Sequence, residues 1–228
     1  MVNRKQNQYL KTIVLATLIT GSLVGAGAYG YFSGTASPKS PTSSSASASS
    51  SSGNSDYVNL KNKVNVLNQK VRSNPNDSSL QQELGNAYYD LGTMARTVAP
   101  NEAREDYLQA IKYYQSVLNT KKDINVLTDM STAAIYTGQN DVAEKGFKEA
   151  LTENPDFIQA LFNYGVFLSE IKKDYASAIS VWQTALDKDP NGPNAERLKQ
   201  IIPQAKDMLA AQQKSNDPVA GTSSNKTP

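Results

Sequence analysis

The chain has 228 residues, of which 39% are hydrophobic and 19% charged, and its formal net charge is +2 at pH 7. Residues 57–214 hold 18 basic and 19 acidic side chains, so no basic surface for nucleic acid is expected. Histidine and cysteine are absent, which excludes the common zinc ligands, thiol catalysis and the usual general base near neutral pH. We therefore expect no metal, no other cofactor and no enzymatic activity. An enzyme that uses only paired carboxylates stays as an alternative.

The N-terminal residues have the pattern of a membrane anchor. Residues 1–11 carry Arg4, Lys5 and Lys11, and residues 12–32 contain no charge. As a helix, these 21 residues would extend about 31 Å, which matches the hydrocarbon thickness of a bilayer. The positive charges predict a cytoplasmic N-terminus, because basic residues stay on the cytoplasmic side. We expect a single-pass signal-anchor helix in the cell membrane, with the remaining chain extracytoplasmic.

A cleaved signal peptide is the alternative for the same residues. Ala26 and Ala28 have the spacing that a signal peptidase recognises, and cleavage would follow Ala28. The uncharged run continues beyond this point through Tyr29, Tyr31 and Phe32, where the aromatic belt of a membrane helix would lie. This continuation favours the anchor, and both alternatives export the domain.

Two segments lack the apolar side chains that a folded structure needs. Residues 33–56 include 12 serines and no large apolar residue, and residues 214–228 are also mostly polar. Such segments cannot offset the entropy cost of ordering. We expect a disordered linker at 33–56 and a disordered tail at 214–228, so the folded domain spans 57–213.

The folded domain contains an internal repeat with a period of 34 to 35 residues. One set of positions comprises Leu127, Met130, Ala143, Phe147, Ala150 and Pro155. The set recurs as Leu161, Tyr164, Ala178, Trp182, Ala185 and Pro190. A period of this length is typical of stacked helical hairpins that form extended binding surfaces.

Each repeat has the pattern of two amphipathic helices. In the first, Asp123 is expected to cap one helix, and Gly138 is expected in the turn before the second. In the next, Asp156 is expected to cap, and Trp182 is expected to fill the core beside Gly165.

Further helices precede and follow these two repeats. An earlier unit is recognised from Leu84 to Leu118, with extra residues at 93–106. These residues contain helix formers and predict longer hairpin helices, and a functional insert is the alternative. Flanking stripes at 57–71 and 198–209 predict single cap helices. The second of these is expected to kink or restart at Pro203.

These residues resemble the tetratricopeptide repeat, whose pattern has Leu-Gly and an aromatic residue, then alanines, an aromatic and a proline over 34 positions. Residues 124–190 match it most closely, and the unit with Leu84, Gly85 and Tyr88 matches it apart from the extra residues. The resemblance implies an all-α helical-hairpin solenoid of about three repeats plus flanking cap helices.

The resemblance also implies a concave groove that is lined by the first helix of each unit. The positions that it assigns to a peptide-binding groove are Asn86, Tyr89, Asp90, Asp129, Thr132, Tyr136, Phe162, Asn163 and Val166. None of them is basic, so the clamp that some family members use for terminal carboxylates is not expected. Amide and aromatic side chains beside two aspartates favour an extended peptide that is neutral or basic. The alternative is that the aromatic residues only pack between adjacent hairpins.

The leading hypothesis is therefore a membrane-tethered adaptor that binds protein or peptide partners, in envelope assembly, secretion or chaperoning. The alternative is a self-assembling structural protein. The helix predicted at 57–71 resembles the second helix of a unit whose first helix is missing, and another copy of the chain could complete it.

Overall fold

The computed structural model describes residues 49–216, which are helical apart from short connections and contain no strand. Within this range, no helix is long and apolar enough to cross a bilayer. The expected N-terminal segment at 1–11, the expected membrane helix at 12–32 and most of the expected linker lie outside the described residues. Those expectations stay predictions.

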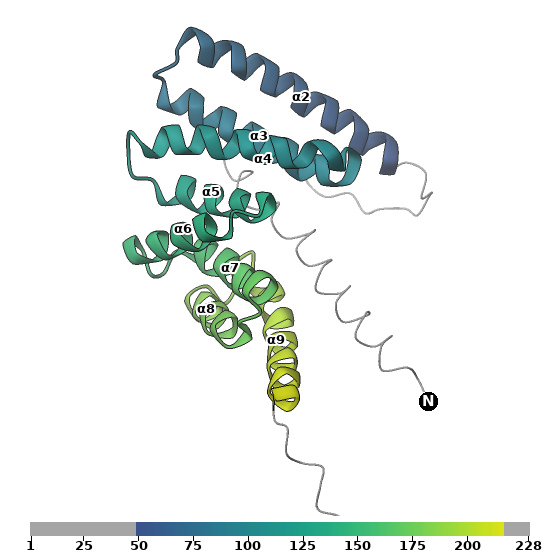
Figure 1. The fold of residues 1–228 in the computed structure, drawn as a ribbon, viewed down its shortest axis with the longest axis vertical. Helices are drawn as coiled ribbons and strands as arrows, with labels where there is room; N and C mark the ends of the chain where they lie inside the picture. The colour runs from purple at the N-terminus through teal and green to yellow at the C-terminus, as the bar shows by residue number, and fades with distance from the viewer. Residues whose placement is uncertain (1–48, 217–228) are drawn as a thin grey trace, which may run out of the picture. The chain divides into compact units, whose positions relative to one another are not determined.

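The described helices divide into two compact units, with the boundary after Asn154. The first unit contains α2 (Ser49–Ser73), α3 (Ser78–Val98), α4 (Pro100–Leu118), α5 (Ile124–Thr137) and α6 (Asn140–Glu153). In this unit each helix packs against the next one along the chain, as Figure 1 shows. Successive helices connected by short turns run antiparallel, which is the expected helical-hairpin arrangement.

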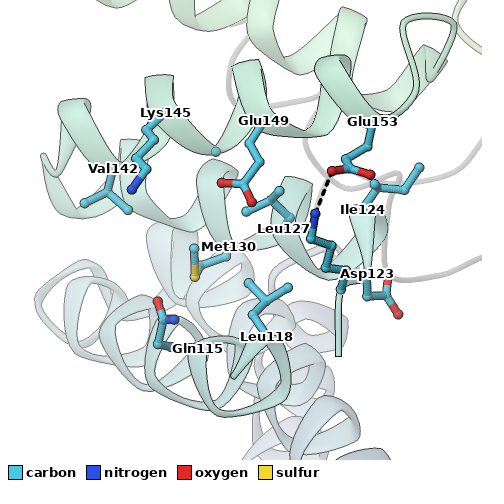
Figure 2. Close-up of a pocket in the computed structure, with 12 residues that line it drawn as sticks. Gln115, Leu118, Asp123, Ile124, Leu127, Met130, Val142, Lys145, Glu149 and Glu153 are labelled. Atoms are coloured by element: carbon cyan, nitrogen blue, oxygen red, sulfur yellow. Dashed lines mark hydrogen bonds and ion pairs between the residues drawn. The ribbon is translucent and has the colours of Figure 1, made fainter. Parts of the chain in front are cut away.

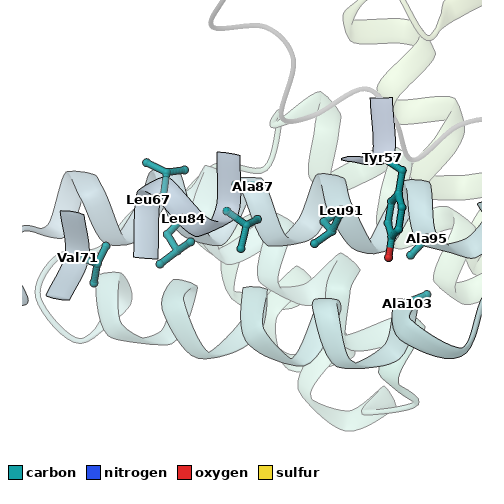
Figure 3. Packing of buried hydrophobic residues seen from close by; sticks show 9 residues of the cluster. Tyr57, Leu67, Val71, Leu84, Ala87, Leu91, Ala95 and Ala103 are labelled. Atoms are coloured by element: carbon teal, nitrogen blue, oxygen red, sulfur yellow. The ribbon is translucent and has the colours of Figure 1, made fainter. Parts of the chain in front are cut away.

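The apolar stripe expected on α2 forms one side of a hydrophobic core. Val64, Leu67 and Val71 on α2 are buried in one cluster with Leu84 and Leu91 on α3. Figure 3 shows Leu67 and Val71 together with the two α3 leucines. The three α2 residues recur at intervals of three and four, which places them on one helix face. The first cap helix therefore packs as the sequence predicts.

The α2 helix begins earlier than the expected domain boundary. The linker was expected to end at residue 56, but α2 starts at Ser49. Nucleation is the step of helix formation that costs most free energy. The buried stripe from Tyr57 onward stabilises α2, so adding the preceding serines to this helix costs little further free energy.

The α3–α4 hairpin accounts for the extra residues at 93–106. The two helices contain 21 and 19 residues, and only Ala99 separates them. Pro100 occupies the first turn of α4, where its missing N–H has no cost. The prediction of longer hairpin helices in place of a loop is confirmed.

The local signals predicted for α5 are also confirmed. The Asp123 carboxylate accepts hydrogen bonds from the N–H groups of Asn125 and Val126 at the start of the helix. Gly138 ends α5 with a φ of 78°, which is a left-handed conformation that glycine adopts without strain. Phe147 on α6 is fully buried, as the repeat pattern requires.

The second unit contains α7 (Ile158–Phe167), a π-helical turn η3 (Leu168–Lys172), α8 (Tyr175–Lys188) and α9 (Ala195–Asn216). Here α7 packs against α8, and α8 packs against α9. The cap position of α7 is Phe157, one residue later than expected, and the Asp156 carboxylate accepts a hydrogen bond of 2.6 Å from Lys188 Nζ. The helix was expected to kink or restart at Pro203; the restart is wrong, because α9 continues through this residue, and the kink stays a prediction.

Trp182 fills the core of the second unit as the sequence predicts. It is 3% exposed, and its indole N–H donates a hydrogen bond of 3.0 Å to the carbonyl of Phe162. The ring occupies the space that a side chain at position 165 would need. A Cβ on Gly165 would collide with Nε1 and lie 2.7 Å from Cε2.

We expect the substitution Gly165→Ala to lower the free energy of unfolding by about 1–3 kcal/mol, because a rigid indole cannot yield to the added methyl group. Urea denaturation followed by the fluorescence of the single tryptophan measures this change. Gly53→Ala in α2 is the control, since its Cβ would meet nothing closer than 3.8 Å and alanine favours a helix. Equal stability of Gly165→Ala and the unchanged chain would contradict the packing.

Candidate functional site

The structure buries several of the groove positions that the resemblance assigns to the first unit. Tyr89 on α3 and Asp129 and Thr132 on α5 are at most 8% exposed. Asn86 and Asp90 on α3 and Tyr136 on α5 are half-buried. Burial raises the pKa of Asp90, and the positive charge of Lys63 acts in the opposite direction.

The groove positions of the second unit all lie on α7 and are buried. Phe162, Asn163 and Val166 are at most 8% exposed. The guanidinium of Arg197 lies 6.0 Å from the centre of the Phe162 ring, within the range of a cation–π contact. The hypothesis that the nine groove positions bind a peptide stays a prediction.

An aromatic stack joins α3, α4 and α5 at the expected groove of the first unit. The Tyr107 ring on α4 lies 4.6 Å from the Tyr136 ring in a stacked arrangement and 5.5 Å from the Tyr89 ring in an edge contact. Arg96 covers the Tyr136 ring at 4.4 Å, and the Thr93 hydroxyl lies 3.0 Å from the Tyr107 hydroxyl. The sequence reasoning missed Tyr107 because it belongs to a second helix, and the stack gives these aromatics a packing role.

A separate hollow of about 360 Å³ lies between α4, α5 and α6 (Figure 2). Its volume is at the lower end of the range for binding pockets in proteins. Five apolar side chains contribute to its lining, and these are Leu118, Ile124, Leu127, Met130 and Val142. Val142 is 39% exposed, so apolar surface is accessible here.

Gly146 contributes to the wall of the hollow and permits a close approach of α6 to α5. A Cβ at this position would collide with the Ser131 Oγ and lie 3.4 Å from a methyl group of Leu127. The Ser131 hydroxyl donates a hydrogen bond of 2.7 Å to the carbonyl of Leu127. The two helices therefore touch at Gly146.

Charged side chains surround the apolar part of the hollow. Lys122 Nζ and Glu153 Oε1 form an ion pair of 2.8 Å, drawn as the dashed line in Figure 2. These side chains are 80% and 45% exposed, so the pair adds little to stability. Lys145 and Glu149 also line the hollow, and both are exposed. The hydrogen bond to Glu153 raises the pKa of Lys122, and the negative charge of Glu149 adds to this effect.

The sequence reasoning missed this hollow because it searched only the first helices of the repeats. Most of its lining comes from the second helices α4 and α6 and from the turn before α5. The available signal was Val142, an apolar residue outside the repeated core positions.

Asp106 on α4 is a carboxylate whose Oδ2 is shielded from solvent and has no hydrogen-bond partner in the described structure. Burial raises the pKa of Asp106 to about 6, and the negative charge of Glu102 adds to this effect. Lys61 acts in the opposite direction, but it is paired with Glu102 at 2.6 Å.

Comparison with known proteins identifies the repeats. The chain is 31% identical over 101 residues to a TPR repeat-containing protein of Dictyostelium discoideum, and the match covers 44% of this chain and 38% of that protein. The chain thus spans well under half of the relative's length. No family model matches the chain.

Solved structures with similar helical arrangements have low sequence identity to the chain. One is described as the MamA RS-1 ArsTM double mutant, with 14% identity, a TM-score of 0.45, and coverage of 68% of this chain and 88% of that one. Another, described as MamA AMB-1, has 14% identity, a TM-score of 0.36, and coverage of 73% and 94%. Both TM-scores are below 0.5, so they do not establish a shared fold.

The recognition of tetratricopeptide repeats is confirmed by the relative and agrees with the stacked hairpins. Within each of the two units, the described helices form successive antiparallel hairpins. Membrane anchoring is not shown by these findings.

We expect Asp106→Asn to raise the melting temperature at pH 7, because it removes a charge that the fold desolvates. The folded chain holds the Asp106 proton up to about pH 6, whereas an unfolded chain releases it near the usual value of 3.8. The stability contributed by this group is therefore present at low pH and decreases as the pH rises through 6. Asp106→Asn should flatten the stability profile between pH 4.5 and 7, as thermal denaturation would measure. Asp207→Asn, the same change at an exposed position on α9, is the control. An unchanged profile in Asp106→Asn would contradict the assignment.

Proposed function

We propose that this tetratricopeptide repeat protein is a membrane-tethered adaptor that binds a protein segment and catalyses no reaction. The hollow between α4, α5 and α6 carries the proposal, because it combines accessible apolar surface with exposed charged side chains. Apolar surface supplies the free energy of association, and charged groups at the rim select the partner.

The hollow also indicates the chemistry of the partner segment. An apolar side chain of the partner would enter beside Val142 and Met130, and a basic and an acidic side chain would meet Glu149 and Lys145. Glu149 and Lys145 are four residues apart on α6, so they lie on one side of the helix about 6 Å apart along its axis. An amphipathic helix with an acidic and a basic residue at the same spacing fits this arrangement.

The concave groove of the family is the second candidate surface for the same function. Asn86 and Asp90 are its accessible members in the first unit, and they would contact a neutral or basic extended peptide. Tyr107 and Arg96 cover the Tyr136 ring. The hollow is favoured because six of the nine groove positions are buried.

Site-specific photo-crosslinking in intact cells tests the binding surface. We expect a photoreactive residue in place of Val142 to form an adduct with a partner protein, because this side chain is exposed at the hollow. A probe at Asn86 tests the groove, and a probe at Ile171 is the control, since it is 37% exposed on η3 outside the hollow.

The segment recovered in the adduct should bind the purified full chain, and Val142→Glu should weaken this binding at least tenfold, whereas Ile171→Glu should not. Adducts at Asn86 without any at Val142 would move the site to the groove. Equal yields of crosslinked adduct at all three positions would contradict the proposal of a specific binding surface.

The membrane tether is supported by the sequence of residues 12–32, which lacks charge, and by the basic residues before it. This arrangement would place the N-terminus in the cytoplasm and the repeats outside. The serine-rich residues after it would allow the repeats to reorient above the lipid.

We expect the full chain to stay in the membrane fraction after extraction at alkaline pH, because an uncharged helix of 21 residues inserts stably. A chain that lacks residues 1–48 should be released. Protease added outside the cytoplasmic compartment should digest the repeats of the full chain. Release of the full chain would rule out the anchor and would favour cleavage after Ala28.

A further inference from the structure

The outer face of α2 has a composition unlike that of the other exposed surface. Positions 55, 58, 59, 62, 65, 66 and 69 are all exposed. At 100° per residue they span an arc of about 120° on one side of the helix. The opposite side carries Tyr57, Val64 and Leu67, which pack against α3.

This outer face contains no charged residue. It carries Val58 and Val66, which are 51% and 53% exposed and are two of the four large hydrophobic residues that are exposed in the described structure. The remaining members are uncharged and polar, and they are Ser55, Asn59, Asn62, Asn65 and Gln69. An uncharged strip with exposed valines is the composition of a contact surface, because soluble helices usually place Lys and Glu outward.

The order of residues on this face is symmetric about Asn62. Val58 and Val66 stand four positions before and after it, and Asn59 and Asn65 stand three positions before and after it. Ser55 and Gln69, both polar and uncharged, stand seven positions away. The valine and asparagine side chains therefore occur in the same order when the helix is followed from either end.

We propose that the outer face of α2 binds the same face of a second copy of this chain, with the two helices antiparallel and a two-fold axis at Asn62. In this arrangement Val58 of each copy reaches the level of Val66 of the other, and Asn59 reaches the level of Asn65. The interface is isologous, so each contact occurs twice.

A second copy fits this face better than an unrelated partner does. An antiparallel pair with its axis at Asn62 brings residues equally distant from the axis to the same level. Val58 then stands level with Val66 and Asn59 with Asn65, so apolar residues meet apolar ones and amides meet amides. At the axis, the Asn62 amide can donate to and accept from its symmetry mate, because an amide has both functions. The absence of charge removes the like-charge repulsion that opposes the pairing of identical surfaces.

Charge-swap variants at Asn62 test the axis. In sedimentation of the detergent-solubilised full chain, the unchanged protein should be dimeric, and Asn62→Lys and Asn62→Asp should each self-associate at least tenfold more weakly. An equimolar mixture of the two variants should recover the dimer, since the charges at the axis are then opposite. Circular dichroism would confirm that both variants keep their helices.

Single cysteines test the antiparallel register, since the chain has no cysteine of its own. In membranes treated with a mild oxidant, Asn62→Cys should form a disulfide-linked dimer. Gln69→Cys should not, although it is equally accessible, because the two copies of position 69 would lie about 21 Å apart along the pair. The double variant Ser55→Cys, Gln69→Cys should form the dimer again.

Three results would overturn the proposal. They are a monomer at high micromolar concentration, equal dimerisation of Asn62→Lys and the unchanged chain, and crosslinking of Gln69→Cys as efficient as that of Asn62→Cys. Each is independent of the partner hollow on α4, α5 and α6, so the adaptor function and the pairing of α2 can fail separately.

Discussion

The close approach of neighbouring helices at glycine and alanine is the constraint on which the fold depends. Gly165 leaves space for the Trp182 ring, Gly92 lies against Tyr107, and Gly146 touches Ser131. A methyl group at any of these three positions would come within 3.2 Å of a neighbouring atom. Small residues on one helix therefore allow large side chains on the next to pack without a cavity, which protein interiors require.

The same packing determines which surfaces are left for function. Tyr89, Tyr107 and Tyr136 stack across three helices, so aromatic area that could contact a peptide instead holds α3, α4 and α5 together. The accessible apolar surface then lies elsewhere, at Val142 beside the hollow and at Val58 and Val66 on α2. Most of the exposed large apolar side chains in the described structure therefore lie outside the first helices of the repeats.

The sequence predicted the fold well because periodicity reports which face of a helix is apolar. The hairpins, the Asp123 cap, the Gly138 turn and the buried Trp182 all follow from spacing and turn chemistry. The burial of Thr132 and Asn163 could not be predicted from residue spacing, because a polar residue in a sequence does not indicate that a neighbouring helix covers it. The hollow was also missed, because its apolar lining is assembled from three helices and the repeat pattern does not show that Leu127 and Met130 line a hollow beside Val142.

The two surfaces proposed for binding differ in charge, and this difference separates their partners. The hollow has Lys145 and Glu149 at its rim, so a partner segment with the opposite charges binds there with higher affinity. These charges do not favour a second copy of the chain over another partner. The outer face of α2 has no charge, and in an antiparallel identical copy its valines stand level with valines and Asn59 stands level with Asn65. Because these residues lie on different helices, a dimer held by α2 would present two hollows. Two linked sites bind a partner with two segments more tightly than one site does.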